Sequence, residues 1–80
     1  MTAVADALRA ALNLEGVSQA QLARATGLTT KHVNQLMTGK VALSVDVALR
    51  MEAVIPRLSA ENLMISQARE QVRAAKAAKR

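Results

Sequence analysis

The sequence contains no cysteine, phenylalanine, tyrosine or tryptophan among its 80 residues, and only one proline and one histidine. Without cysteine, the chain can form neither a disulfide framework nor a cysteine-based zinc site. Without aromatic rings, it lacks the stacking surfaces on which RNA-recognition and oligonucleotide-binding folds hold single-stranded bases. Double-stranded nucleic acid remains among the ligands that such a composition allows.

The sequence offers little for catalysis. The single histidine, His32, supplies neither a paired-histidine metal motif nor a Ser-His-Asp arrangement. We therefore expect no enzyme activity, no metal or other cofactor and no small-molecule substrate. The first residues lack the basic and apolar regions of a signal peptide, and no apolar run approaches membrane-spanning length. We expect a cytoplasmic protein that does not act at a membrane.

Alanine and leucine, with 17 and 10 residues, dominate the apolar half of the chain. Both lose little side-chain freedom in a helix. Val4, Leu8 and Leu12 recur at helical spacing and predict a first helix over residues 3–13. Capping and helix-breaking residues then divide the chain further. The predicted starts are Ser18, Thr29, Ser44 and Ser59, and the predicted stops are Gly16, Gly27, Gly39 and Pro56. The sequence thus predicts an all-α fold, a five-helix orthogonal bundle.

The most informative stretch is residues 19–38, where two short predicted helices flank a three-residue turn. Two helices that cross steeply need a small residue at their contact, and Ala23 stands there. The turn needs Gly27, which tolerates a positive φ. The second helix needs branched apolar anchors, which Val33 and Leu36 supply. This joint pattern predicts a helix-turn-helix.

The segment VSQAQLARATGLTTKHVNQLMTGK resembles the helix-turn-helix of the Xre and phage-repressor superfamily. The segment LSVDVALRMEAVIPRLSAENLMISQA is similar to the part that follows the motif in HigA and VapI-type antitoxins. Its matching positions are Leu43, Ser44, Ala48, Leu49, Arg50, Ser59, Glu61, Met64 and Gln67. Leu63 and Glu70 stand where that antitoxin branch usually carries Trp and Tyr. The resemblance covers about residues 17–69 and implies a lambda-repressor-like DNA-binding domain.

In helix-turn-helix proteins the second helix enters the major groove, so its outward side chains read base edges. We expect these to be Thr30, Lys31, Asn34 and Gln35. Lys31 can donate to guanine, and Asn34 or Gln35 can pair bidentately with adenine. The resemblance to phage repressors implies a phosphate contact at Gln19. A second expected phosphate site consists of Thr38, Lys40 and the helix start at Ser44, because a helix N-terminus attracts anions and lysine adds a full charge. His32 is a further candidate DNA contact, and Arg24 and Arg50 each either contact DNA or lie on a solvated helix flank.

The positive charge is concentrated at the end of the chain. Residues 1–68 hold six basic and five acidic residues, whereas residues 69–80 hold five basic residues and one acidic residue. We therefore divide the chain into a helix-turn-helix domain (1–68) and a basic, partly frayed helical extension (69–80). The extension carries a basic stripe of Arg69, Arg73, Lys76 and Arg80. This stripe is solvated, contacts DNA or pairs with an acidic toxin surface.

An apolar line of Ile65, Ala68, Val72 and Ala75 lies on the same predicted helix and either closes the core or meets a second subunit. We predict a sequence-specific repressor that binds double-stranded DNA, as a homodimer on a palindromic operator. Its setting is an antitoxin that represses its own operon and binds a cognate toxin, or a phage immunity or Cro-type repressor. A helical protein-interaction module that binds a partner through the last helix, without reading DNA, is the alternative.

Overall fold

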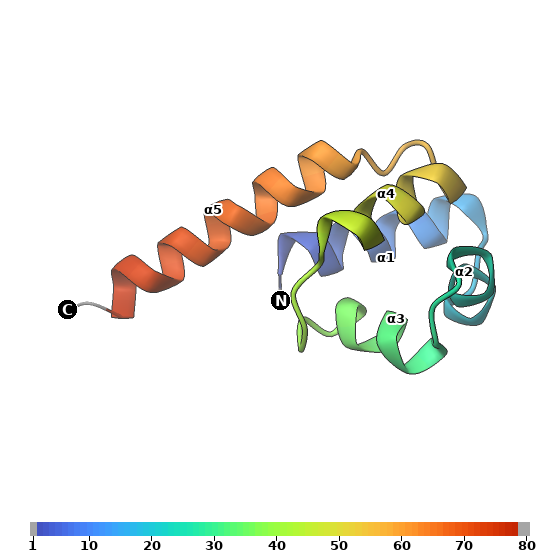
Figure 1. Ribbon diagram of the computed structural model, residues 1–80, viewed down its shortest axis with the longest axis horizontal. Helices are drawn as coiled ribbons and strands as arrows, with labels where there is room; N and C mark the ends of the chain where they lie inside the picture. The colour runs from blue at the N-terminus through green and yellow to red at the C-terminus, as the bar shows by residue number, and fades with distance from the viewer. Residues whose placement is uncertain (1, 79–80) are drawn as a thin grey trace.

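The computed structural model describes residues 2–78, and these form five α-helices and no strand. The helices are α1 (Ala3–Glu15), α2 (Gln19–Thr26), α3 (Thr30–Met37), α4 (Val45–Val54) and α5 (Ala60–Ala78). Helices α1 to α4 gather into one body, and α5 runs along it before its C-terminal half projects beyond it (Figure 1). The predicted all-α, five-helix architecture is confirmed.

Each of the first four helices begins at a hydroxyl residue that caps it. The side chains of Thr2, Ser18, Thr29 and Ser44 each accept a hydrogen bond from the backbone N–H three residues later. Such a cap satisfies an otherwise unpaired donor and contributes about 1 kcal/mol. Ser59 does the same at the start of α5, where its Oγ lies 3.2 Å from the backbone nitrogen of Asn62. The predicted helix starts are therefore confirmed.

The predicted helix ends also agree closely with the structure. Gly27 has φ 76°, and its N–H donates to the carbonyls of the last turn of α2. L-residues with a Cβ rarely adopt this conformation, which explains the glycine. Helix α3 ends one residue earlier than expected, because Thr38 is its cap and Gly39 follows at φ 74°. Helix α4 ends at Val54, and Ile55 is extended before Pro56.

One core joins all five helices. Its largest fully buried side chains are Leu8, Leu22, Val33, Leu36, Met51 and Ile55. Of the apolar residues on α4, Val45 and Leu49 lie outside this core, with 59% and 53% of their surface exposed. Helix α4 therefore has apolar residues on its solvent side as well. The spacing of apolar residues in the sequence does not distinguish this side from the core side.

The first half of α5 is fastened to the rest of the domain by side chains. Gln67 accepts from the backbone N–H of Leu43 at 2.6 Å and donates to its carbonyl at 2.8 Å. One turn later, Glu70 accepts from the backbone N–H of Ala3 at 2.8 Å. The packed domain thus continues past residue 68, within a helix unbroken to Ala78.

Arg80, the last residue of the expected basic stripe, lies outside the described residues, as does Lys79. No helix within residues 2–78 is long and apolar enough to span a membrane.

Candidate nucleic-acid interface

Helix α3 has a buried face and a polar face. Val33, Leu36 and Met37 are buried against the other helices. The side chains expected to read bases lie on the opposite side. Thr30, Lys31 and Asn34 are exposed, and Gln35 is half-buried at the edge. The structure thus brings the four predicted base readers together on one outward surface, which we call the α3 face (Thr30, Lys31, Asn34 and Gln35).

Gln19, at the first turn of α2, lies next to the α3 face. Its Oε1 accepts a hydrogen bond of 3.4 Å from Nδ2 of Asn34. This contact leaves the Gln19 amide with two free N–H donors, which is what a phosphate oxygen requires. Asn34 keeps one N–H donor and its carbonyl oxygen, the pair of groups that reads adenine in the major groove. One hydrogen bond therefore sets the orientation of a phosphate candidate and a base-reading candidate together.

Arg9 of α1 supports the end of α3, and sequence reasoning assigned it no role. Its Nη2 donates to the carbonyl oxygen of Met37 at 3.3 Å. The last carbonyls of a helix lack partners within the helix and carry partial negative charge, so a guanidinium stabilises them. No local sequence pattern predicts this contact, because it joins residues that are 28 positions apart.

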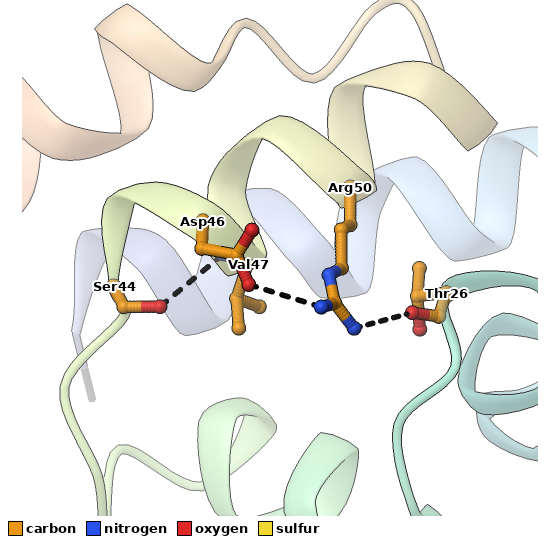
Figure 2. A network of polar contacts seen from close by, with 5 residues as sticks. All are labelled: Thr26, Ser44, Asp46, Val47 and Arg50. Carbon is orange, nitrogen blue, oxygen red and sulfur yellow. Dashed lines mark hydrogen bonds and ion pairs between the residues drawn. The ribbon is translucent and has the colours of Figure 1, made fainter.

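Arg50 of α4 supports the turn between α2 and α3, as Figure 2 shows. Its Nη1 donates to the carbonyl oxygen of Thr26 at 3.2 Å, and its Nη2 lies 3.2 Å from a carboxylate oxygen of Asp46. The sequence left two roles open for Arg50, a DNA contact or a solvated position, and the structure shows a third. Its guanidinium links the helix-turn-helix to α4 and is already engaged by two acceptors.

The remaining phosphate candidates lie in the segment between α3 and α4. Lys40 is exposed, and its side chain has no ion-pair partner among residues 2–78. The Ser44 hydroxyl accepts from the N–H of Val47 and keeps its own proton for another acceptor. Thr38 differs, because its hydroxyl proton is directed to the carbonyls of Asn34 and Gln35. In this rotamer Thr38 offers a phosphate no donor.

The stretch of sequence that contains the α3 face has basic residues but no acidic ones. Residues 16–45 contain Arg24, Lys31 and Lys40 but no aspartate or glutamate. The first acidic residue after this segment, Asp46, is paired with Arg50. A count over residues 1–68 hides this asymmetry, because the acids of α1, α4 and α5 cancel it. The sequence does show this asymmetry when charges are counted separately for each predicted helix and its neighbours.

Arg24 and His32, the two further candidates, differ in exposure. Arg24 is exposed near the end of α2, and His32 is half-buried on α3 between Lys31 and Val33. No group of three or more His, Cys, Asp or Glu residues that would suit a metal ion occurs within residues 2–78.

The basic stripe of α5 is separate from the α3 face. Helix α5 packs mainly on α1 and α4. Its C-terminal half, with Arg69, Arg73 and Lys76, points away from α2 and α3 (Figure 1).

The comparisons with known proteins give one match. The sequence pattern of the HTH_3 family, described as helix-turn-helix, matches residues 8–63, more than half of the chain. No curated protein and no solved structure matches the chain significantly. The matched range includes α2, α3 and the turn between them.

Proposed function

The chain belongs to the HTH_3 family of Xre-type helix-turn-helix domains, and on this basis we propose that it is a sequence-specific transcriptional repressor. Membership of this family indicates a DNA-binding regulator. The repressor acts in the cytoplasm as a homodimer on a palindromic operator. The observation that carries the proposal is the α3 face. Its four polar side chains lie on the outward side of a helix whose other side is buried, in a segment that contains no aspartate or glutamate.

In this proposal α3 enters the major groove of B-form DNA. Lys31 donates to the O6 or N7 acceptors of guanine, and Asn34 pairs with the adenine edge. Gln19, Lys40 and Ser44 hold phosphates on either side and so fix the register of α3 in the groove. Repression follows from occlusion, because a promoter covered by the dimer is closed to the transcription machinery.

The homodimer is argued from energetics. Helix α3 has eight residues, so one copy touches only a few base pairs. Each correct base pair adds about 1–3 kcal/mol of discrimination, which for a single half-site is small against a genome of competing sites. Two copies related by a two-fold axis double this term. They predict half-sites about 34 Å apart, one turn of the double helix.

Selection of bound duplexes from a random DNA pool, followed by mobility-shift titration of the selected site, tests the proposal. The double variant Lys31→Ala/Gln35→Ala is expected to lose about a hundredfold in affinity, since it removes two of the four side chains of the α3 face that are expected to read bases. The matched control is Arg73→Ala/Gln71→Ala, which removes the same kinds of side chain from α5. It should stay within about threefold of wild type, and both variants should melt near the wild-type temperature. Binding without preference for any sequence contradicts the proposal.

Two biological settings fit this function. The similarity of residues 43–68 to HigA and VapI-type antitoxins favours an antitoxin that represses its own operon and binds a cognate toxin. The replacement of the usual Trp and Tyr by Leu63 and Glu70 favours a phage immunity or Cro-type repressor. A short toxin-like reading frame beside the gene supports the first setting, and neighbouring lysogeny genes support the second.

A helical protein-interaction module is the second candidate function. The exposed apolar side chains on α5, Ile65 and Val72, favour it. The Lys31→Ala/Gln35→Ala variant separates the candidates, because only a DNA-reading repressor loses its cellular activity with this change.

A further inference from the structure

The loop between α3 and α4, residues 38–44, carries two of the proposed phosphate contacts, Lys40 and Ser44. Six of its seven residues are exposed, and Leu43 alone is buried. Its start continues the hydrogen bonding of α3, since the Lys40 N–H donates to the Gln35 carbonyl oxygen at 2.9 Å. After Lys40 the backbone of the loop leaves α3 and needs another support.

That support comes from one side chain of α5. Gln67 accepts a hydrogen bond from the Leu43 N–H at 2.6 Å and donates one to the Leu43 carbonyl oxygen at 2.8 Å. The neighbouring N–H groups of Val41, Ala42 and Ser44 make no hydrogen bond within the described part of the chain. The middle of the loop is therefore tied to the domain at Leu43.

Packing adds little to this restraint. A cavity of about 210 Å³ lies beside the loop, and residues 39–42 line it together with Gln67, Glu70 and Gln71 of α5. Open space, rather than a close-packed side chain, thus separates this part of the loop from α5. The loop has room to move toward α5 when the bonds to Leu43 are absent.

The chemistry of the tie explains why an amide stands at position 67. A glutamine side chain carries an acceptor and a donor on the same carbon, so it can pair with the N–H and the carbonyl of one residue. A lysine could only donate, and an ionised glutamate could only accept. Gln67 therefore restrains the peptide groups on both sides of Leu43.

These peptide groups set the direction of the next residue. The Leu43 carbonyl and the Ser44 N–H belong to one peptide bond, which is trans, so they point in opposite directions. With the carbonyl held by Gln67, the free Ser44 N–H points away from α5. In Figure 1 the loop runs between α3 and α5, so this N–H is directed to the side of the domain where α3 lies.

We propose that Gln67 is a positioning residue for DNA binding. It does not touch DNA. It holds the loop where Lys40 and Ser44 reach the phosphates beside the groove that α3 enters. The inference rests on the proposed function, because the contacts that Gln67 positions are those of the repressor. It gives the first half of α5 a role in DNA binding that is separate from the basic stripe.

Mobility-shift titration over a range of salt concentrations tests this role. Gln67→Met keeps the side-chain length and removes both hydrogen bonds to Leu43. It should weaken binding to the selected operator about tenfold and reduce the slope of log affinity against log salt by about 0.9 per half-site. Gln71→Met is the matched control, because it makes the same change one turn further along, and should stay within about threefold of wild type with an unchanged slope.

Loss of folded protein alone would not give this result, because it lowers the affinity by the same factor at every salt concentration. Phosphate contacts carry no sequence information, so Gln67→Met should keep the wild-type order of preference among operators with one changed base pair. A Gln67→Met variant with the wild-type salt slope overturns the inference.

A double-variant cycle with Lys40 tests whether Gln67 acts through the loop. In the Lys40→Ala background, Gln67→Met should cost only about threefold, since one of the contacts that it positions is already absent. A purely structural role would give the same loss in both backgrounds. Equal losses therefore count against the positioning role.

Hydrogen exchange without DNA tests the geometry directly. In Gln67→Met, the Leu43 amide should exchange at least about tenfold faster relative to the Lys40 amide, which keeps its bond to Gln35. An unchanged ratio shows that Gln67 does not hold the loop, and the inference is then wrong. If wild type binds DNA without sequence preference, the proposed function fails. If wild type binds its operator and only the changes expected for Gln67→Met are missing, the inference fails alone.

Discussion

The outward side of α3 and the last two turns of α5 are both exposed and carry positive charge, yet the domain holds the two helices very differently. Helix α3 is capped by Thr29 at its start and contacted by Arg9 at its end, and its buried side packs in the core. In α5 the side-chain hydrogen bonds to the domain stop at Glu70, and every residue from 71 to 78 is exposed. Positive charge alone therefore does not distinguish the helix that we propose reads DNA from the C-terminal half of α5.

The difference matters because sequence reading requires fixed geometry. An isolated helix of eight residues is not stable in water, so the order of α3 comes from its packing and its supports. Its polar side chains are thus already held in place in the free protein, as the proposed base recognition requires. Residues 71–78 have no such supports, and any ligand that fixes them must offset the lost freedom. The supported helix suits base recognition, and the unsupported one suits association or solvation.

The largest effect on stability is expected when a core side chain on the buried side of α3 is shortened. Leu36→Ala deletes a side chain that is only 1% exposed and should lower the free energy of unfolding by about 3 kcal/mol. In a domain of this size, this corresponds to a fall in melting temperature of roughly 15 °C. Circular dichroism at 222 nm measures it. Leu49→Ala, at a leucine 53% exposed on α4, is the control and should cost less than about 0.5 kcal/mol. Equal losses in the two variants would contradict the assigned core.

The next largest effect on stability distinguishes the first half of α5, which is hydrogen-bonded to the domain, from the second half, which is not. Gln67→Ala removes both hydrogen bonds to the backbone of Leu43 and leaves a partly buried N–H and carbonyl without partners. The expected loss is about 2 kcal/mol. Gln71→Ala, one turn further along and exposed, should change stability by less than about 0.5 kcal/mol. Urea unfolding gives both values, and a stable Gln67→Ala variant would show that α5 is not fastened as described.

Most of the fold could be predicted from local signals in the sequence. The caps at Ser18, Thr29 and Ser44, the turn at Gly27 and the stop before Pro56 each depend on residues within one or two turns of the chain. Such short-range chemistry is visible without a structure. The outward direction of the α3 face followed from the same spacing.

The supports of the site could not be predicted, because they join distant residues. Arg9 meets Met37, and Arg50 meets Thr26, across separations of 28 and 24 positions. The exposure of Val45 and Leu49 was also hidden, since an apolar residue on a helix flank has the same letter whether it is buried or not. These features depend on how the helices pack, which spacing within one helix does not specify.

A smaller effect is expected at the contact between α4 and the turn. Arg50→Met keeps much of the side-chain length but removes the hydrogen bond to the Thr26 carbonyl, at an expected cost of about 1 kcal/mol. Asp46→Asn is the control, because it removes the exposed ion pair and leaves the bond to Thr26. It should cost at most a few tenths of a kcal/mol, about the value of an exposed pair. If Asp46→Asn costs as much as Arg50→Met, the ion pair and not the bond to the turn is what matters.

The smallest effect concerns single surface cations, and it compares the two basic regions directly. Lys40→Ala and Arg73→Ala should both leave the free energy of unfolding within about 0.5 kcal/mol of wild type, since both side chains are exposed and unpaired among residues 2–78. On DNA they should differ. A lysine that neutralises a phosphate releases counterions, so Lys40→Ala should reduce the slope of log affinity against log salt by about 0.9 per half-site. Arg73→Ala should leave the slope unchanged, because the C-terminal half of α5 projects away from α3 (Figure 1). A reduced slope for Arg73→Ala would place the C-terminal half of α5 on the DNA backbone and remove the distinction between the two regions.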